Sequence, residues 1–244
     1  MTEPGAAPVG GVTVDLDDTL YPQADWLSGA WAAVAAAGDR QGLPAASLHR
    51  ALVEAGAAGS DRGGIIDRAL AAVGVREDAV AALVPDLVIV FAGHRPERLT
   101  PYDGVLDALA RLAAAVPVVV ITDGIPAVQH AKVEALGVGH LLAGVVVSDE
   151  LGGRNLRKPH PAPFHRALEL LGEPATRVVH VGDRPEKDVR GASAVGMRSI
   201  RVTTGEYAAL QDGPDLPWRT APTFAEAADL CLAGTGTTAA ALRL

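Results

Sequence analysis

Short apolar runs rich in β-branched residues alternate along this chain with stretches of helical periodicity. Five such runs occur, at residues 12–15, 116–122, 144–148, 177–182 and 199–203. Their apolar character is continuous, which is typical of strands buried on both faces of a parallel sheet. Proline marks the expected start of several intervening helices and glycine their ends. The pattern predicts an α/β fold: a Rossmann-like, doubly wound parallel sheet with helices on both faces.

The alternation is interrupted once, between the first and second apolar runs. Residues 23–95 are rich in alanine and have helical spacing, with glycine or proline breaks that include Pro85. We therefore predict an α/β core domain from residues 1–22 and 96–244, and a small α-helical cap domain from residues 23–95. Segment 87–91 (LVIVF) favours strand by composition, but its place just before the return to the core favours a buried helix.

The last part of the chain carries a helix-start signature. Thr223 and Glu226 have the spacing of a capping box, which predicts a short helix to about residue 232. Residues 234–244 (GTGTTAAALRL) are expected to be frayed.

Composition excludes several classes of protein. The chain has 244 residues, 49% of them hydrophobic, and a net charge of −8 without a basic run, so no nucleic-acid partner is expected. It has no signal-peptide pattern and no apolar run of transmembrane length, which predicts no membrane association. The single Cys231 excludes an intramolecular disulfide and fits a reducing compartment. We expect a cytoplasmic protein of unknown oligomeric state.

Four polar segments each follow an apolar run. They are DLDDT at 15–19, TDG at 122–124, the lysine of RKPHP at 157–161, and GDRPEKD at 182–188. In an open parallel sheet, ligands bind beyond the carboxyl ends of the strands, next to the point where the strand order reverses. We therefore expect the four segments to form one site.

The acids of these segments suit phosphoryl transfer. The Asp15 carboxylate could attack phosphorus and form an aspartyl phosphate. Asp17 could protonate the leaving alcohol and then deprotonate water, and the neighbouring carboxylates are expected to raise its pKa. Mg²⁺ could take oxygen ligands from Asp15, a backbone carbonyl near Asp17, Asp183 and waters.

Donors and a cation for the substrate phosphate occur in the middle segments. Thr122, with the following backbone amides beginning at Asp123, offers donors to a phosphoryl oxygen. Lys158 offers a fixed positive charge where the equatorial oxygens gather negative charge. Because the other charges of the site are carboxylates, both Lys158 and the metal are electrostatically necessary.

In these four segments, taken in this order, the chain resembles the haloacid dehalogenase superfamily of hydrolases. The resemblance spans roughly residues 10–205, and the inserted 23–95 segment resembles that superfamily's helical cap. It implies a nucleophile at Asp15, a general acid/base at Asp17, phosphate binding by Thr122 and Lys158, and Mg²⁺ ligation by Asp15, Asp17 and Asp183. It also implies that Asp188 supports the metal or Lys158 without itself contacting the substrate.

Asp17 also separates the reaction classes of the superfamily. Dehalogenases and phosphonate-cleaving members lack this acid, so the resemblance argues against both. Sugar phosphomutases keep it but usually carry glycine in place of Asp18, which we expect to face outward or to structure the turn. The leading prediction is thus that the protein hydrolyses small-molecule phosphomonoesters, such as sugar phosphates or nucleotides. The reaction would depend on Mg²⁺ and pass through an aspartyl phosphate.

Three alternatives stay open. One is a sugar phosphomutase of the same superfamily. Another is a receiver-like signalling domain, although receivers place the acceptor aspartate on the third strand and have no cap insertion. The third is a non-catalytic binding protein, although packing alone does not require adjacent acids at strand ends.

Several other residues have competing interpretations. The loop before Lys158 adds Arg154 and Arg157, which are either solvated charges or contacts to a second anionic group of the substrate. His180 is expected to be a hydrogen-bonded packing residue. Trp26 and Trp31 are expected either to pack within the cap or to line the substrate pocket.

Overall fold

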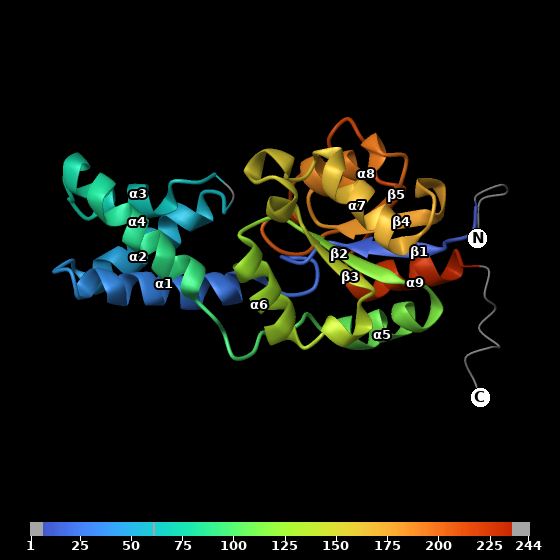
Figure 1. The fold of residues 1–244 in the computed structure, drawn as a ribbon, viewed down its shortest axis with the longest axis horizontal. Coiled ribbons are helices and arrows are strands. Elements are labelled where there is room, and N and C mark those ends of the chain that lie inside the picture. The colour runs from blue at the N-terminus through green and yellow to red at the C-terminus, as the bar shows by residue number, and fades with distance from the viewer. Residues whose placement is uncertain (1–6, 61, 236–244) are drawn as a thin grey trace. The chain divides into compact units, whose positions relative to one another are not determined.

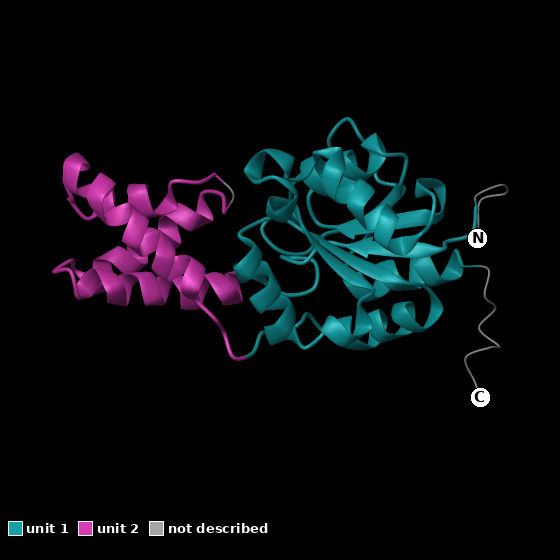
Figure 2. Ribbon diagram, in the orientation of Figure 1, with its two compact units in different colours: residues 1–23, 98–244 teal, residues 24–97 magenta. Residues whose placement is uncertain are grey.

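The computed structural model describes residues 7–60 and 62–235, so most of the 234–244 segment expected to be frayed lies outside the described residues. The chain divides into two compact units (Figure 2). One unit contains residues 1–23 and 98–244, and the other contains residues 24–97. The second unit is thus an insertion into the first.

The first unit is built on one parallel sheet. In the described residues six strands pair in the order β3-β2-β1-β4-β5-β6 (Figure 1). Their bounds are β1 Gly11–Val14, β2 Val118–Thr122, β3 Gly144–Val147, β4 Val178–Gly182, β5 Arg198–Val202 and β6 Arg219–Ala221. All pairs are parallel. The five predicted strands and the fold class are confirmed. The edge strand β6 was not predicted, because only one of its three residues is apolar.

Helices cover both faces of this sheet (Figure 1). On one face lie α7 (Pro161–Leu171) and α8 (Arg190–Ala194), and Phe164 is fully buried in the core beneath them. On the other face α5 (Val105–Ala115) packs against α9 (Phe224–Ala233). The capping box that predicts α9 forms, since the Thr223 hydroxyl accepts a hydrogen bond from the Glu226 amide at 3.2 Å. The buried faces of these helices bury the two faces of the sheet in apolar layers, which stabilises the unit.

The strand order determines where a ligand site can form. β1 lies between β2 and β4, and Val14 pairs with Val120 on one side and Val181 on the other. The chain leaves β1 toward β2 and β3, then crosses to β4 on the opposite side. The connections that leave the neighbouring strands β1 and β4 therefore run in opposite directions, and open α/β sheets bind ligands at the carboxyl ends of two such strands.

The inserted unit is helical. Its helices are α1 (Gln23–Asp39), α2 (Ala45–Ala57), α3 (Ile65–Ala72) and α4 (Glu77–Gly93). Three aromatic rings pack together in it: Trp26 meets Phe91 edge-on at 5.0 Å between ring centroids, and Trp31 stacks on the same ring at 4.7 Å. Trp26 is 2% exposed and Trp31 4% exposed, so both are packing residues of this unit.

Helix α4 contains the segment whose conformation was ambiguous in the sequence. Residues 87–91 are helical, as predicted, but only Leu87 is buried, and Ile89 is 68% exposed. The expectation of a buried helix is thus wrong for most of this segment. Pro85 does not end the helix either, although its ring nitrogen cannot donate the hydrogen bond of an ordinary residue.

Candidate active site

The carboxyl ends of three adjacent strands bring the predicted segments together. Asp15 directly follows β1, and its amide still donates to the Val181 carbonyl of β4 at 2.8 Å. Thr122 is the last residue of β2, and Asp183 directly follows β4. Lys158 arrives from the loop before α7 and inserts its side chain among them, where it is 4% exposed.

Lys158 is the electrostatic centre of this cluster. Its Nζ donates to an oxygen of Asp15, to Asp188 Oδ1 at 2.7 Å and to the Ile121 carbonyl at 3.2 Å. Burial alone would lower the pKa of Lys158, but the Asp15 and Asp188 carboxylates outweigh it and raise the pKa above its ordinary value. Burial raises the pKa of Asp15 to about 7, even though Lys158 opposes that rise. The lysine is therefore a permanent cation beside Asp15.

Asp183 is a buried carboxylate whose nearest cationic group, Arg184 Nε, lies 3.9 Å from Oδ2, beyond hydrogen-bond distance. It is fully buried, and neither of its oxygens has a hydrogen-bond partner among the described residues. Burial, reinforced by Asp188 and Asp15, raises its pKa well above the ordinary value. Asp15, Asp183 and Asp188 each place an oxygen within 4.8 Å of the other two. Hard cations such as Mg²⁺ take oxygen ligands of this kind, so the residues fit such an ion.

Asp188 differs from Asp183 because both of its oxygens accept hydrogen bonds from the protein. Besides Lys158, it accepts from His180 Nε2 at 3.2 Å and from the Arg184 amide at 3.0 Å. Burial alone would raise the pKa of Asp188, but Lys158 and His180 bring it well below its ordinary value. His180 is fully buried, and its Nδ1 lies 2.9 Å from the Thr13 hydroxyl. Asp188 thus orients Lys158, and His180 is hydrogen-bonded as predicted.

The end of β2 presents one hydroxyl and one side chain that organises the loops. Thr122 Oγ1 accepts a 2.5 Å hydrogen bond from Nε2 of the Gln129 side chain, which leaves the Thr122 hydroxyl hydrogen for another acceptor. Asp123 Oδ1 accepts from the Ser148 hydroxyl at 2.8 Å and from the Lys158 amide at 3.0 Å. The Asp123 side chain therefore ties together the loops after β2 and β3, and its role as a phosphate donor concerns its backbone amide.

The Asp17 carboxylate does not join the acids of the metal cluster. Lys132 Nζ lies 2.7 and 2.9 Å from its two oxygens, the Tyr21 hydroxyl donates at 2.5 Å, and Gln129 donates at 3.0 Å. Burial alone would raise the pKa of Asp17, but Lys132 and the other donors bring the pKa below its ordinary value. The expectation of a pKa raised by neighbouring carboxylates is therefore wrong, because a buried lysine lies closer than any of them.

Asp18 does not face outward; it structures the turn after β1. It is 4% exposed and adopts a left-handed backbone conformation with φ of 58°. Its Oδ1 accepts from the Gln23 amide at 2.9 Å and its Oδ2 from the Glu206 amide at 3.3 Å, and Thr204 donates to its carbonyl. Asp18 thereby joins the turn that carries Asp17 to the loop after β5.

The long loop before Lys158 is held by an internal ion pair. Arg157 donates both from Nε and from Nη2 to the two oxygens of Asp149, each at 2.6 Å. Arg157 is therefore a paired charge, whose Nε and Nη2 groups are directed to Asp149. Arg154 is exposed, which agrees with the solvated alternative for that residue.

Gln129 and Lys132 are the parts of the site that the sequence analysis missed. Both project from α6 (Pro126–Leu136), where they are 2% and 3% exposed. The available signal was their spacing of three residues on the helix face that also carries Val128 and Leu136. Polar side chains on an otherwise apolar face are unusual and can mark a buried polar network.

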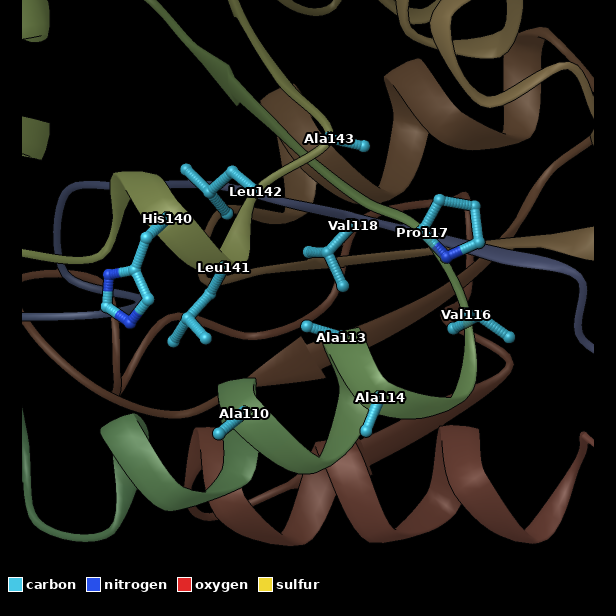
Figure 3. Close-up of a pocket in the computed structure, with 10 residues that line it drawn as sticks. All are labelled: Ala110, Ala113, Ala114, Val116, Pro117, Val118, His140, Leu141, Leu142 and Ala143. Atoms are coloured by element: carbon cyan, nitrogen blue, oxygen red, sulfur yellow. The ribbon is translucent and has the colours of Figure 1, made fainter.

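A separate pocket of about 450 Å³ lies at the opposite edge of the sheet, where β2 and β3 begin (Figure 3). Its walls come from α5, the start of β2 and the segment before β3, and they include Ala113, Val118 and Leu141. His140 is its single titratable lining residue. Its position excludes it from the chemistry of the strand-end acids.

The fold and the site define an α/β protein with an inserted helical unit and with acids clustered around one buried lysine at the carboxyl ends of the strands. Residues 9–196 match the family model for haloacid dehalogenase-like hydrolases. The chain therefore belongs to the haloacid dehalogenase-like hydrolase family, which confirms the resemblance seen in the motifs. This membership also separates it from the receiver domains.

Curated relatives of the chain are phosphatases. A glyceraldehyde 3-phosphate phosphatase from Methanopyrus kandleri is 32% identical over 205 residues, which cover 82% of this chain and 86% of the relative. A phosphoglycolate phosphatase from Pectobacterium atrosepticum is 32% identical, with 81% of each chain covered. These similarities confirm the prediction of a haloacid dehalogenase-like phosphatase.

Solved structures support the same fold. A 2-haloacid dehalogenase from Pseudomonas syringae has a TM-score of 0.64 at 28% identity and covers 92% of this chain and 98% of its own. A Bacillus subtilis hydrolase solved with magnesium has a TM-score of 0.69 at 16% identity, covering 92% and 99%, and shows the fold alone. Among the described residues, none of the helices has the length and apolar character needed to cross a bilayer.

Proposed function

We propose that this protein is a Mg²⁺-dependent hydrolase of small-molecule phosphomonoesters that works through an aspartyl phosphate on Asp15. The observation that carries the proposal is the pairing of two unlike carboxylates beside one buried lysine. Asp15 is neutralised by Lys158, whereas Asp183 has no hydrogen-bond partner among the described residues. A buried, unpartnered carboxylate is costly, and a divalent cation would compensate it.

The residues that would hold Mg²⁺ are the carboxylates of Asp15 and Asp183 and the backbone carbonyl of Asp17. Asp188 would support the site without binding the ion directly, because its oxygens already accept hydrogen bonds from Lys158, His180 and a backbone amide. When bound, the cation supplies positive charge that lowers the pKa of Asp15 and screens the carboxylates from an anionic substrate.

The first half of the reaction uses Asp15, Lys158 and Thr122. An Asp15 oxygen forms a bond to phosphorus while the bond from phosphorus to the ester oxygen breaks. Lys158 and the Thr122 hydroxyl stabilise the charge on the equatorial oxygens, together with the Asp123 amide. Asp17 in its protonated form gives that proton to the departing alkoxide, so that an alcohol leaves and Lys132 stabilises the carboxylate that remains.

The second half hydrolyses the acyl phosphate. Asp17, now a carboxylate, accepts a proton from water, and the water oxygen attacks phosphorus. The bond between phosphorus and the Asp15 oxygen breaks, which frees inorganic phosphate and restores both acids. Asp17 lies two residues from Asp15 in the turn after β1, so one short segment supplies both the nucleophile and the proton carrier.

We propose small phosphorylated acids and aldehydes as the first substrates to test. This proposal is supported by two relatives, which are named glyceraldehyde 3-phosphate phosphatase and phosphoglycolate phosphatase. The role of residues 24–97 as the cap that selects the substrate is part of the same proposal. We also propose that the protein acts in the cytoplasm, where its lone Cys231 would stay reduced.

A sugar phosphomutase is the second candidate, since Asp17 is retained in both classes. Identities to phosphatases over most of the chain favour hydrolysis. A mutase would convert a sugar 1-phosphate to its 6-phosphate without releasing phosphate, and this outcome would replace the proposal.

The test is a phosphate-release screen over a panel of two- to six-carbon phosphomonoesters and nucleotides. Each compound is assayed with Mg²⁺, with chelator, with chelator followed by excess Mg²⁺, and with the Asp15→Asn variant. We expect release only when Mg²⁺ and Asp15 are both present, and recovery when Mg²⁺ is restored. Release that survives both chelation and the Asp15→Asn change would refute the mechanism.

A further inference from the structure

A buried lysine on α6 contacts the side chain of Asp17. Lys132 is 3% exposed, and its Nζ contacts both oxygens of Asp17, at 2.7 and 2.9 Å. Both partners are in the unit that contains the sheet. From this geometry we infer that Lys132 is a positioning residue, which fixes the Asp17 carboxylate for its exchange of protons with the substrate. The inference rests on the proposed function.

Stability alone explains this pair poorly. Buried ion pairs often contribute no more stability than apolar side chains of the same size, because both charges lose their hydration. The rest of the buried face of α6 is largely apolar, with Val128, Val133 and Leu136. A methionine at position 132 could fill the same space, so the ammonium group points to a role at Asp17.

Gln129 extends the contact to the phosphate-binding side of the site. Its Nε2 donates to Asp17 at 3.0 Å and to the Thr122 hydroxyl at 2.5 Å. Gln129 and Lys132 lie one turn apart on the same helix. Helix α6 therefore sets the distance between the proton carrier and the hydroxyl that we assign to the phosphate.

Tyr21 completes the arrangement from the other side. Its hydroxyl donates to Asp17 Oδ1 at 2.5 Å, and its ring is fully buried. Asp17 thus has directional partners from two segments, which restricts rotation of its carboxylate. Among these partners Lys132 alone contacts both oxygens, so its loss should free the carboxylate most.

The test compares substrates that differ in their need for a proton. An alkyl phosphate has a poor leaving group and needs proton donation, whereas p-nitrophenyl phosphate releases a stable anion and does not. For Lys132→Met we expect kcat on the alkyl phosphate to fall about tenfold or more, with KM nearly unchanged, because positioned acid catalysis contributes about 10²–10⁴-fold. The rate at which p-nitrophenolate is released in the first turnover, before Asp17 is needed to deprotonate water, should change less than about threefold. Lys132→Arg, which keeps the charge, should recover part of the loss.

A second arm tests whether Lys132 acts through Asp17. In an Asp17→Asn background, Lys132→Met should cause no further loss of kcat. In the metal-free protein, Lys132→Met should lower the thermal midpoint of the wild type but not that of Asp17→Asn, in which the lysine has lost its anionic partner. Glu134→Gln, an exposed charge removal on the same helix, is the matched control and should leave both readouts unchanged.

The outcomes separate the two proposals. If the wild type with Mg²⁺ hydrolyses none of the phosphomonoesters, the proposed function fails and this inference with it. If the wild type is active but Lys132→Met slows release of the leaving group in the first turnover equally for both substrates, or adds to the loss of kcat in Asp17→Asn, only the positioning role is overturned.

Discussion

Replacing Asp183 with asparagine should make the metal-free protein more stable, not less. The change removes a buried negative charge whose oxygens have no hydrogen-bond partner among the described residues, and it keeps the volume of the side chain. Leaving a buried polar group unsatisfied costs about 1–3 kcal/mol, and more for a charged one. We therefore expect a gain of about 2 kcal/mol at pH 8. In a chain of 244 residues this corresponds to a rise of about 4–8 °C in the unfolding midpoint.

The pH dependence of this gain follows from the raised pKa of Asp183. In the unfolded chain the pKa is near 3.8, and in the folded protein it lies well above that value. The wild type consequently loses stability as the pH rises from about 3.8 toward the folded-state pKa. The advantage of Asp183→Asn should thus be smaller at pH 5 than at pH 8.

The assay is thermal unfolding of both proteins in chelator and in Mg²⁺. Saturating Mg²⁺ should stabilise the wild type, by about 2.7 kcal/mol at a hundred times the Kd, and should leave Asp183→Asn nearly unchanged. Asp86→Asn, at an exposed position of the inserted unit, serves as the control. A variant less stable than the wild type in chelator at pH 8 would refute the reasoning that the buried Asp183 carboxylate, which accepts no hydrogen bond among the described residues, destabilises the metal-free protein.

Further outcomes concern the loops and the lone thiol. Arg157→Ala should reduce stability by about 1 kcal/mol and lower kcat, because its paired contact to Asp149 holds the loop that delivers Lys158, whereas Arg154→Ala should leave both unchanged. A stable Arg157→Ala enzyme with wild-type kinetics would contradict this. Asp18→Ala should destabilise by about 1–3 kcal/mol in chemical denaturation, because two backbone amides lose their acceptor and alanine disfavours the φ of 58°. Burial raises the pKa of Cys231 to about 12, so a thiol reagent at pH 8 should label it only after unfolding; rapid labelling of the native protein would show that the site is open.

The sheet and the strand-end acids could be predicted because they depend on local patterns. Continuous apolar runs identify buried strands, and the rule that ligands bind at their carboxyl ends brings Asp15, Thr122 and Asp183 to one edge. Lys158 follows from motif order despite its longer loop. The structure places all four where that reasoning expects them, and their chemical roles stay predictions until activity is measured.

The surroundings of Asp17 could not be predicted in the same way. Its pKa depends on a lysine 115 residues away in sequence, and motif spacing does not tell which buried face of a helix reaches which loop. Asp18 illustrates the same limit, since two of its partners, Thr204 and Glu206, come from the loop after β5. Helix α4 shows a local limit, because composition alone could not tell that Pro85 lies inside it or that Ile89 is exposed.

The central position of β1 has a consequence for the order of events during synthesis. Asp15 is made early, but the strands on either side of β1 are completed only at residues 122 and 182. The inserted helices, by contrast, pack within one continuous segment, and such local contacts form quickly. On the ribosome, therefore, the insertion can fold while the amino-terminal strand still waits for its partners. The nucleophile cannot reach its final setting until about three quarters of the polypeptide has emerged, so a nascent chain stalled before β4 should carry a folded insertion and no hydrolytic activity.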